Sequence, residues 1–205
     1  ELQIYGDFFF EKEKWEEARQ LYEKAESTRH DSRVLIRLFE IAQKTGHSFD
    51  FNRFLDSDSV EDLREYGDFF FEKGDWDKAR QLYKKAEKRN PDAETVEKLF
   101  LIAEKSGQPF DFSHLIASDD PDALRAYGDF FSEKEKWEEA RQLYEKAGKI
   151  EQNDAETLKK QYVIGEKTGK PFDIHAFTDS NDQEELQNYG QFFYEQGKWE
   201  EARKK

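Results

Sequence analysis

The chain has 205 residues, a formal net charge of −14 and no cysteine, and it is 36% hydrophobic but 16% aromatic. Disordered chains are poor in aromatic residues, so these values exclude a disordered protein, and the lack of cysteine excludes disulfides and thiolate metal sites. Acidic charge argues against nucleic-acid binding, which needs clustered Lys and Arg, and no apolar run approaches the ~18 residues of a membrane span, so we expect a soluble protein without membrane insertion.

An internal repeat organises the whole chain. The tetrad Tyr-Gly-x-Phe-Phe recurs at intervals of 61, 61 and 62 residues, and four tryptophans keep the same intervals. Residues 11–25 and 133–147 are identical in sequence. Because internal repeats indicate stacked structural units, we predict a single repeat domain over residues 1–205. Its units are residues 5–65, 66–126, 127–188 and a truncated 189–205.

The first part of each unit has the pattern of a helical hairpin. In the second unit, apolar or small residues between Leu63 and Phe70 fall at i, i+3, i+4 and i+7, which is one helical face. Gly74 interrupts this pattern, and a second helical stripe follows and ends before Pro91. The spacing therefore predicts two antiparallel helices joined by a short turn.

The second part of each unit predicts two further helices. One runs from Asp92 and is closed by Gly107, since glycine commonly ends a helix. Phe110-Asp111-Phe112 then precedes a helix of about two turns, with Asp111 as its N-cap. Asp120-Pro121 starts the next unit as N-cap and first helical residue. Three units of four helices and two helices in the last give about fourteen, and the fold class is all-α.

The hairpin resembles the tetratricopeptide repeat family. In the second unit the resemblance depends on Leu63, Tyr66, Gly67, Phe70, Ala79, Tyr83, Ala86 and Pro91. It implies a right-handed α-solenoid of stacked antiparallel hairpins. The second part of each unit departs from the family pattern, because Phe39, Phe100 or Tyr162 stands where glycine is expected. We interpret the chain as regular repeats of 34 residues alternating with degenerate repeats of about 27.

The resemblance also implies which positions pack in the core and which line a binding groove. Small residues let the two helices of a hairpin approach closely, and aromatic residues fill the surrounding space. We expect this structural core to contain Tyr66, Gly67, Phe70, Trp76, Ala79 and Tyr83. The opposite face of the first helix is expected to line a concave groove that binds an extended or helical peptide. The expected groove residues are Asp7, Phe10, Arg64, Asp68, Phe71, Arg125, Asp129, Gln191 and Tyr194.

Two features of this expected groove allow alternative interpretations. Asp7, Asp68 and Asp129 would attract a basic partner if they were unpaired, or they pair with neighbouring Lys or Arg. Each third consecutive aromatic follows two core aromatics, and a helix cannot turn all three inward. These side chains, Phe10, Phe71 and Tyr194, either anchor a partner side chain or pack on the adjacent half-repeat.

The sequence contains no catalytic or metal-binding motif. It has no Gly-rich phosphate loop, no nucleophile elbow and no histidine pair with metal-ligand spacing. We predict that the chain is not an enzyme and needs no cofactor or metal. The favoured function is a protein–protein interaction scaffold that binds a protein or peptide, expected to be basic.

The chain is alternatively a structural or engineered repeat that self-associates end to end, or a binder of sugars or small aromatic molecules. It starts without methionine in the middle of the repeat pattern, which favours a fragment, a processed form or an engineered chain. The compartment stays unknown, although a chain without disulfides is compatible with the cytoplasm.

Overall fold

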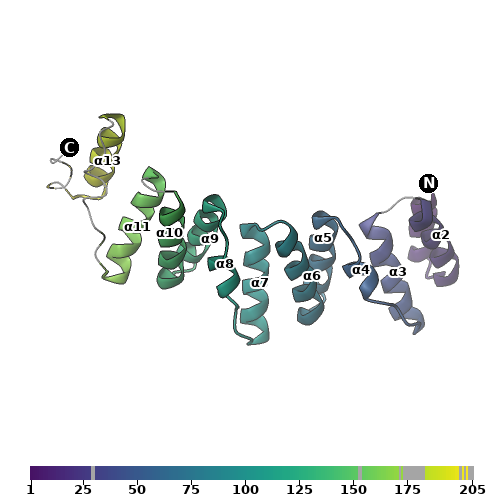
Figure 1. Ribbon diagram of the computed structural model, residues 1–205. Coiled ribbons are helices and arrows are strands. Elements are labelled where there is room, and N and C mark those ends of the chain that lie inside the picture. Colours follow the sequence, from purple (N-terminus) through teal and green to yellow (C-terminus); the bar gives the residue numbers. More distant parts are fainter. Residues whose placement is uncertain are drawn as a thin grey trace. The chain divides into compact units, whose positions relative to one another are not determined.

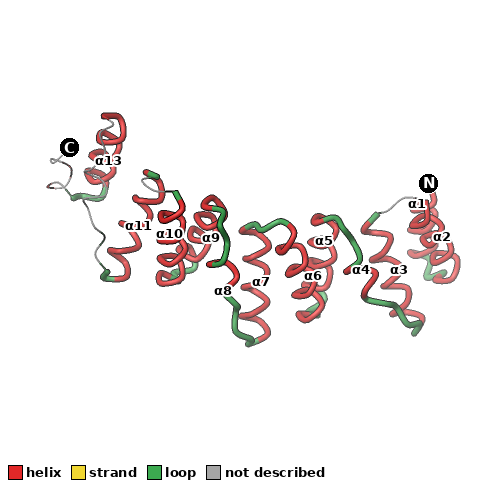
Figure 2. The backbone as a smooth tube through the Cα atoms, in the orientation of Figure 1, coloured by secondary structure: helices red, strands yellow, loops and turns green. Residues whose placement is uncertain are grey.

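The computed structural model describes residues 1–28, 31–151, 154–170, 172, 183–198, 200 and 202. Within these residues every regular element is a helix (Figures 1 and 2). The chain divides into two compact parts, residues 1–109 and 110–205, and we describe each by itself. From here on these two parts are the first and second unit, and each repeat of about 61 residues is a copy.

The described residues form twelve helices. The first unit holds α1 (Leu2–Glu11), α2 (Trp15–Thr28), α3 (Ser32–Thr45), α4 (Asn52–Leu55), α5 (Val60–Glu72), α6 (Trp76–Arg89) and α7 (Ala93–Ser106). The second unit holds α8 (Ser113–Ile116), α9 (Pro121–Glu133), α10 (Trp137–Ile150), α11 (Ala155–Thr168) and α13 (Gln183–Glu195). The predicted count of about fourteen is therefore corrected to twelve in this part of the chain. The two others were predicted after Asp173 and at 199–205, which lie outside the described residues apart from single positions.

The two helices of each long hairpin approach closely because glycine faces tyrosine. A Cβ atom on Gly67 of α5 would lie 2.7 Å from Cε1 of Tyr83 on α6. Gly128 and Tyr144 meet in the same way in the second unit, at 2.5 Å. A distance this short leaves no room for a methyl group, so the glycine is required by packing.

The expected core residues are buried with one exception. Tyr66, Phe70, Ala79 and Tyr83 each expose 1% or less of their surface. Trp76 is only partly buried. The residue opens α6 directly after the hairpin turn, where its ring lies edge-on to Phe71 at 5.2 Å and under the Lys105 ammonium at 5.9 Å. Its environment is therefore the rim of the hairpin.

Capping residues set the ends of the helix that follows each long hairpin. Asp92 accepts a hydrogen bond from the backbone N–H of Thr95 at 2.9 Å, and Asp154 does the same for Thr157 at 2.7 Å. Gly107 ends α7 in the left-handed conformation, with φ of 68°. Both devices satisfy backbone groups that a helix terminus leaves without partners.

The turn of the long hairpin also needs a left-handed residue. Gly74 occupies this position with φ of 75°, but Glu13 and Glu135 occupy it in two other copies with φ of 57°. A side chain costs energy in this conformation because its Cβ crowds the following carbonyl oxygen. These two turns are therefore strained relative to the turn that contains Gly74.

The short helix has one turn in the two degenerate repeats where the structure describes it, so the prediction of about two turns is wrong there. It spans four residues in α4 and in α8. Asp50 and Asp111 accept the backbone N–H of the residue two positions later, at 3.0 Å and 3.1 Å. The N-cap residues are Phe51 and Phe112, so the prediction of Asp111 as N-cap is wrong by one residue. The chain is held here by a side-chain turn followed by a single helical turn.

An aromatic cluster joins this short segment to the next long hairpin. Phe54 of α4 is fully buried, and its ring centroid lies 4.8 Å from Tyr66 and 5.2 Å from Phe70. Phe39 of α3 approaches Phe70 at 5.2 Å in an edge-to-face geometry. Aromatic pairs of this kind stabilise beyond the area that they bury, so the degenerate repeat supplies the layer that covers α5.

Candidate functional site

A three-residue contact links the three helices around the second long hairpin. The Tyr83 hydroxyl donates a hydrogen bond of 2.6 Å to Oδ1 of Asp68, and Lys98 Nζ lies 2.7 Å from the same oxygen. The residues come from α5, α6 and α7, at sequence spacings of 15 and 15. The Asp68 side chain stays 45% exposed, so the contact lies at the protein surface.

The second unit repeats this arrangement. Tyr144 donates to Asp129 at 2.6 Å, and Lys160 Nζ lies 2.6 Å from Oδ2 of the same carboxylate. Asp68 and Asp129 are thus paired with a cation, as the alternative interpretation of the sequence proposes. An unpaired row of carboxylates is not present at these two positions.

The first copy differs in its cation. Asp7 accepts a hydrogen bond of 2.6 Å from Tyr22, but the nearest Arg37 nitrogen lies 3.9 Å away, beyond hydrogen-bond distance. Arg37 instead donates to Glu40 at 2.8 Å. Lys73 also reaches Glu40, at 3.4 Å. Asp7 therefore keeps more of its charge toward solvent than its two counterparts.

The environment of the tyrosines fixes their protonation. Burial raises the pKa of Tyr83, and its hydrogen bond to Asp68 raises the pKa further. The same two causes, in the same order, raise the pKa of Tyr22 and Tyr144. Each hydroxyl thus stays a hydrogen-bond donor over the physiological pH range.

In the first two hairpins the third consecutive aromatic packs and is also partly exposed. Phe10 lies edge-on to Trp15 with ring centroids 5.2 Å apart, and the Arg37 guanidinium lies 4.5 Å from its ring. Phe71 makes the equivalent contacts with Trp76 and, at 5.5 Å, with Lys98. These rings are held by neighbours in the same unit, which corresponds to the packing alternative.

The remaining expected groove residues have different environments. Arg64 Nε donates to Oγ1 of Thr95 at 3.0 Å, and Arg125 Nη1 lies 3.2 Å from Asp154. Both arginines thus hold the N-terminal cap of the following helix. Gln191 donates to Glu195 at 2.8 Å on α13, and Tyr194 is 56% exposed. Arg64 and Arg125 are therefore engaged in the protein itself.

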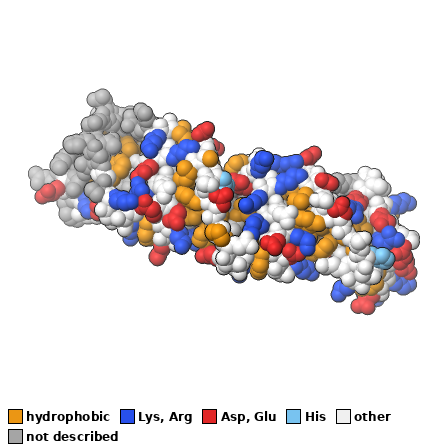
Figure 3. All heavy atoms as spheres, turned by 60° about the horizontal axis from the view of Figure 1, so that its bottom comes forward, with side chains coloured by type: hydrophobic (Ala, Val, Ile, Leu, Met, Phe, Trp, Pro, Cys, Tyr) orange, Lys and Arg blue, Asp and Glu red, His pale blue; other side chains and the backbone are white. Residues whose placement is uncertain are grey.

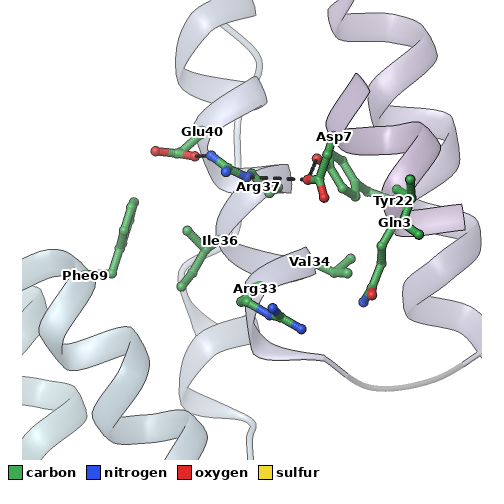
Figure 4. Close-up of a pocket in the computed structure, with 10 residues that line it drawn as sticks. Gln3, Asp7, Tyr22, Arg33, Val34, Ile36, Arg37, Glu40 and Phe69 are labelled. Carbon is green, nitrogen blue, oxygen red and sulfur yellow. Dashed lines mark hydrogen bonds and ion pairs between the residues drawn. The ribbon is translucent and has the colours of Figure 1, made fainter. Parts of the chain in front are cut away.

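A pocket of about 540 Å³ opens between α1, α3 and α5 of the first unit (Figure 4). In Figure 4, Arg37 lies between Asp7 and Glu40, and Ile36 lies between α3 and the Phe69 ring. The wall is thus part charged and part apolar. The lining residues are Gln3, Ile4, Asp7, Tyr22, Arg33, Val34, Ile36, Arg37, Glu40 and Phe69.

The second unit has a pocket at the equivalent position, with a volume of about 300 Å³. Asp129, Tyr144, Lys160 and Phe192 occupy the places of Asp7, Tyr22, Arg37 and Phe69. The same part of the repeat therefore forms a hollow in both units.

Sequence reasoning missed the apolar wall of the first pocket. Ile36 and Phe69 were not among the expected groove residues, although Ile36 stands where the other copies have Glu97 and Lys159. The sequence does contain a signal for this wall, because Ile36 is apolar at a position that is charged in the other copies. Such a residue is informative when it lines a pocket.

The described residues were also compared with the features of charged, metal-binding and membrane-spanning sites. On the face in view in Figure 3, acidic and basic side chains are interspersed. Among the residues described, no group of His, Asp and Glu side chains is arranged to hold a metal ion. Within the same residues, no helix is both long enough and apolar enough to cross a membrane.

Comparison with known families gives one match. Residues 50–94 match the tetratricopeptide repeat model. They include α5, α6 and the Gly67–Tyr83 contact. The resemblance expected from the sequence is thus confirmed for this segment. A search of curated proteins finds no match.

Solved structures with tetratricopeptide repeats are similar at low identity. The C-terminal part of a repeat-containing protein from Cytophaga hutchinsonii is 14% identical, with 95% of this chain and 78% of that chain covered and a TM-score of 0.37. PilF of Pseudomonas aeruginosa is 16% identical, with coverages of 98% and 95% and a TM-score of 0.36. The TPR2AB domain of yeast Sti1, solved with an Hsp90 peptide, is 16% identical, with coverages of 98% and 85% and a TM-score of 0.33. These values are too low to carry an argument about binding.

Proposed function

We propose that this chain, in which residues 50–94 match the tetratricopeptide repeat, is a non-enzymatic protein–protein interaction scaffold. Its partner is an extended or helical segment of another protein. The segment lies along the surface formed by the first helix of a long hairpin and the helix that follows that hairpin. Repeat proteins commonly use such continuous helical surfaces for binding.

The recurrence of the pocket is the observation that carries this proposal. A pocket appears at the equivalent position in each unit, lined by an aspartate, a tyrosine, a cation and a phenylalanine. Pockets that combine an apolar wall with a few polar groups are the usual form of a binding site. Two equivalent sites on one chain favour a partner that presents a backbone with side chains at intervals.

A selection experiment tests this function. Peptides are selected from a random library displayed on phage against the whole chain, and the enriched sequences are synthesised with blocked termini. Affinity is then measured by fluorescence anisotropy for the chain and for the double variant Ile36→Asp, Val163→Asp, which places a charge on the apolar wall of each pocket. We expect this variant to lose at least tenfold in affinity, because a buried unpaired charge is costly.

The matched control carries the same added charge elsewhere. Gln20 and Gln142 are exposed and occupy equivalent places on α2 and α10. The double variant Gln20→Asp, Gln142→Asp is expected to bind as the unaltered chain does. The groove proposal fails if no peptide is enriched, or if the control variant loses binding and the groove variant keeps it.

Self-association is a second candidate, favoured by the exposed face of α1. Ile4, Tyr5 and Phe8 are 70%, 58% and 53% exposed, whereas the equivalent Tyr66 is fully buried under Phe54. Apolar side chains that gather on one surface often mark an interface. Sedimentation velocity over a range of concentrations tests this candidate. Tyr5→Asp is expected to abolish any dimer, and a chain that stays monomeric at high concentration argues against it.

A further inference from the structure

The three equivalent aspartates differ in how completely a cation of the protein neutralises them. Lys98 and Lys160 approach Asp68 and Asp129 to hydrogen-bond distance, at 2.7 Å and 2.6 Å. In the first copy the corresponding distance is 3.9 Å, from Arg37 to Asp7. The Tyr hydroxyl contact is 2.6 Å in all three copies. Only the cation contact therefore distinguishes the first copy.

Glu40 accounts for this difference. It lies one helical turn after Arg37, accepts a hydrogen bond from it at 2.8 Å and is only 18% exposed. The second and third copies have Leu101 and Val163 at the equivalent position, and neither side chain can compete for the lysine. Glu40 thus holds Arg37 away from Asp7.

The Asp7 carboxylate lines a pocket that differs from the equivalent pocket of the second unit. Ile4 and Ile36 line the pocket of about 540 Å³, and Phe69 closes it on the side of α5 (Figure 4). In the third copy the place of Ile36 is taken by Lys159, whose ammonium lies 5.8 Å from the Phe192 ring. The Phe69 ring of the first copy also has an ammonium beside it, that of Lys73 at 5.2 Å, so the difference between the two pockets is the apolar Ile36 in place of a lysine.

We propose that the pocket of the first unit is the specificity site for the partner segment, and that it takes a Lys or Arg side chain on Asp7 next to a large apolar side chain on Ile4, Ile36 and Phe69. This proposal deepens the scaffold function and depends on it. The partner cation pairs with a carboxylate that the Tyr22 hydroxyl already orients at 2.6 Å. Arg37 does not obstruct the site because it stays with Glu40 and over the Phe10 ring.

Charge complementarity selects a basic over an acidic partner at this position. Asp31, Asp7 and Glu65 all raise the pKa of Arg33 at the pocket rim, and the Asp31 carboxylate pairs with it at 3.1 Å. Arg33 is therefore neutralised locally, and Arg37 is neutralised by Glu40. Asp7 has no cation of the protein at hydrogen-bond distance, since Arg37 lies 3.9 Å away, and a carboxylate attracts a cation on approach.

The peptides selected on the whole chain also test this inference. We expect the enriched sequences to contain Lys or Arg near a large apolar residue. Asp7→Asn is expected to weaken their binding about tenfold, as the loss of a charged hydrogen bond does. Asp68→Asn is the matched control, and we expect it to change affinity less than about twofold because Lys98 already occupies that carboxylate.

A second variant addresses the cause of the specificity. Glu40→Leu gives the first copy the residue type of Leu101. Arg37 is then released to Asp7, and we expect it to exclude the peptide cation and lower affinity about tenfold while circular dichroism shows an unchanged helix content. An increase in affinity, or no change, would overturn the assignment of Glu40.

The outcomes separate the two proposals. If Ile36→Asp with Val163→Asp abolishes binding but Asp7→Asn leaves it unchanged, the scaffold function stands and the specificity site is wrong. If enriched peptides lack basic residues, the specificity site is likewise wrong. If no peptide is enriched, both proposals fail.

Discussion

Tyr83 donates its hydroxyl hydrogen to Asp68 across 2.6 Å, and this bond connects the packed interior of the hairpin to its exposed surface. The tyrosine is 1% exposed, whereas the aspartate side chain is 45% exposed. Lys98 approaches the same carboxylate from the next helix. A surface charge is thereby held in place by a core residue, which fixes the direction in which the carboxylate points.

Replacement of Tyr83 by phenylalanine tests the energetic contribution of this bond. The ring keeps its packing while the hydrogen bond to a charged acceptor disappears. We expect the free energy of unfolding to fall by about 1 to 2 kcal/mol, since bonds of this kind contribute roughly that amount. Urea denaturation followed by circular dichroism measures the change. A loss below about 0.3 kcal/mol would show that the bond does not stabilise the hairpin.

At Tyr66 we expect the same substitution to have the opposite effect on stability. Its side chain is fully buried, and within the described residues its hydroxyl has no hydrogen-bond partner. A buried hydroxyl without a partner carries a desolvation cost. Tyr66→Phe is therefore expected to leave the free energy of unfolding unchanged or to raise it by up to about 1 kcal/mol. Clear destabilisation would show that the hydroxyl is satisfied in solution.

Gly67→Ala is expected to destabilise the second hairpin. The new methyl would lie 2.7 Å from the buried Tyr83 ring, and overpacking of this kind costs about 1 to 3 kcal/mol. Alanine recovers up to about 1 kcal/mol of helix propensity, so the melting temperature should fall. Gly148→Ala is the control, because its methyl meets the side-chain amide of Gln161 at 2.6 Å, and the next atom, Thr157 Cγ2, lies at an ordinary 3.5 Å. Equal effects of the two variants would contradict the packing argument.

The hairpin turns offer a stabilising substitution. Glu135 has φ of 57°, where another copy has Gly74. Relief of the left-handed strain, about 1 to 2 kcal/mol, exceeds the entropy that glycine adds to the unfolded chain, about 0.5 to 1 kcal/mol. Glu135→Gly should therefore raise the free energy of unfolding by about 0.5 to 1 kcal/mol. Gly74→Glu should lower it, and the two variants compared by thermal denaturation test the sign.

Alkaline pH should destabilise the protein through its buried tyrosines. Burial and the hydrogen bonds to aspartate raise the pKa of Tyr83 and Tyr144 in the folded state above the ordinary value of 10.0. Their stabilising contribution is thus complete below pH ~10 and declines as pH rises toward the folded-state pKa. Tyrosinate absorbance during an alkaline titration should show these residues ionising only together with unfolding. Ionisation of Tyr83 or Tyr144 themselves near pH 10 in a chain that stays helical would contradict the burial argument.

The hairpins and their ends could be predicted from the sequence because local patterns determine them. Helical periodicity identified α5 and α6, and Asp120 with Pro121 marked the start of α9. Gly67 was recognised as a close-approach residue. These features depend on residues that lie within one hairpin or one helix terminus.

The environment of the expected groove residues could not be predicted in the same way. The cation of Asp68 comes from a helix 30 residues later, and Arg64 turns to the cap of that same helix. Helical periodicity places a residue on a face but does not identify its partner across helices. The repeated spacing of aspartate, tyrosine and lysine is a signal for this contact, and it becomes interpretable once the helices are in place.

The close contact between Gly67 and the Tyr83 ring limits where recombination can divide the chain without disturbing a hairpin. Neither residue can be altered alone without a clash or a void, so the segment between them is inherited as one block. The third copy has one residue more than the first two, and the sequence places it in the stretch 148–153, after the interlocked pair of that hairpin. The same pairing occurs in Gly6 with Tyr22 and Gly128 with Tyr144, so we expect a recombined chain to stay folded when whole hairpins are exchanged.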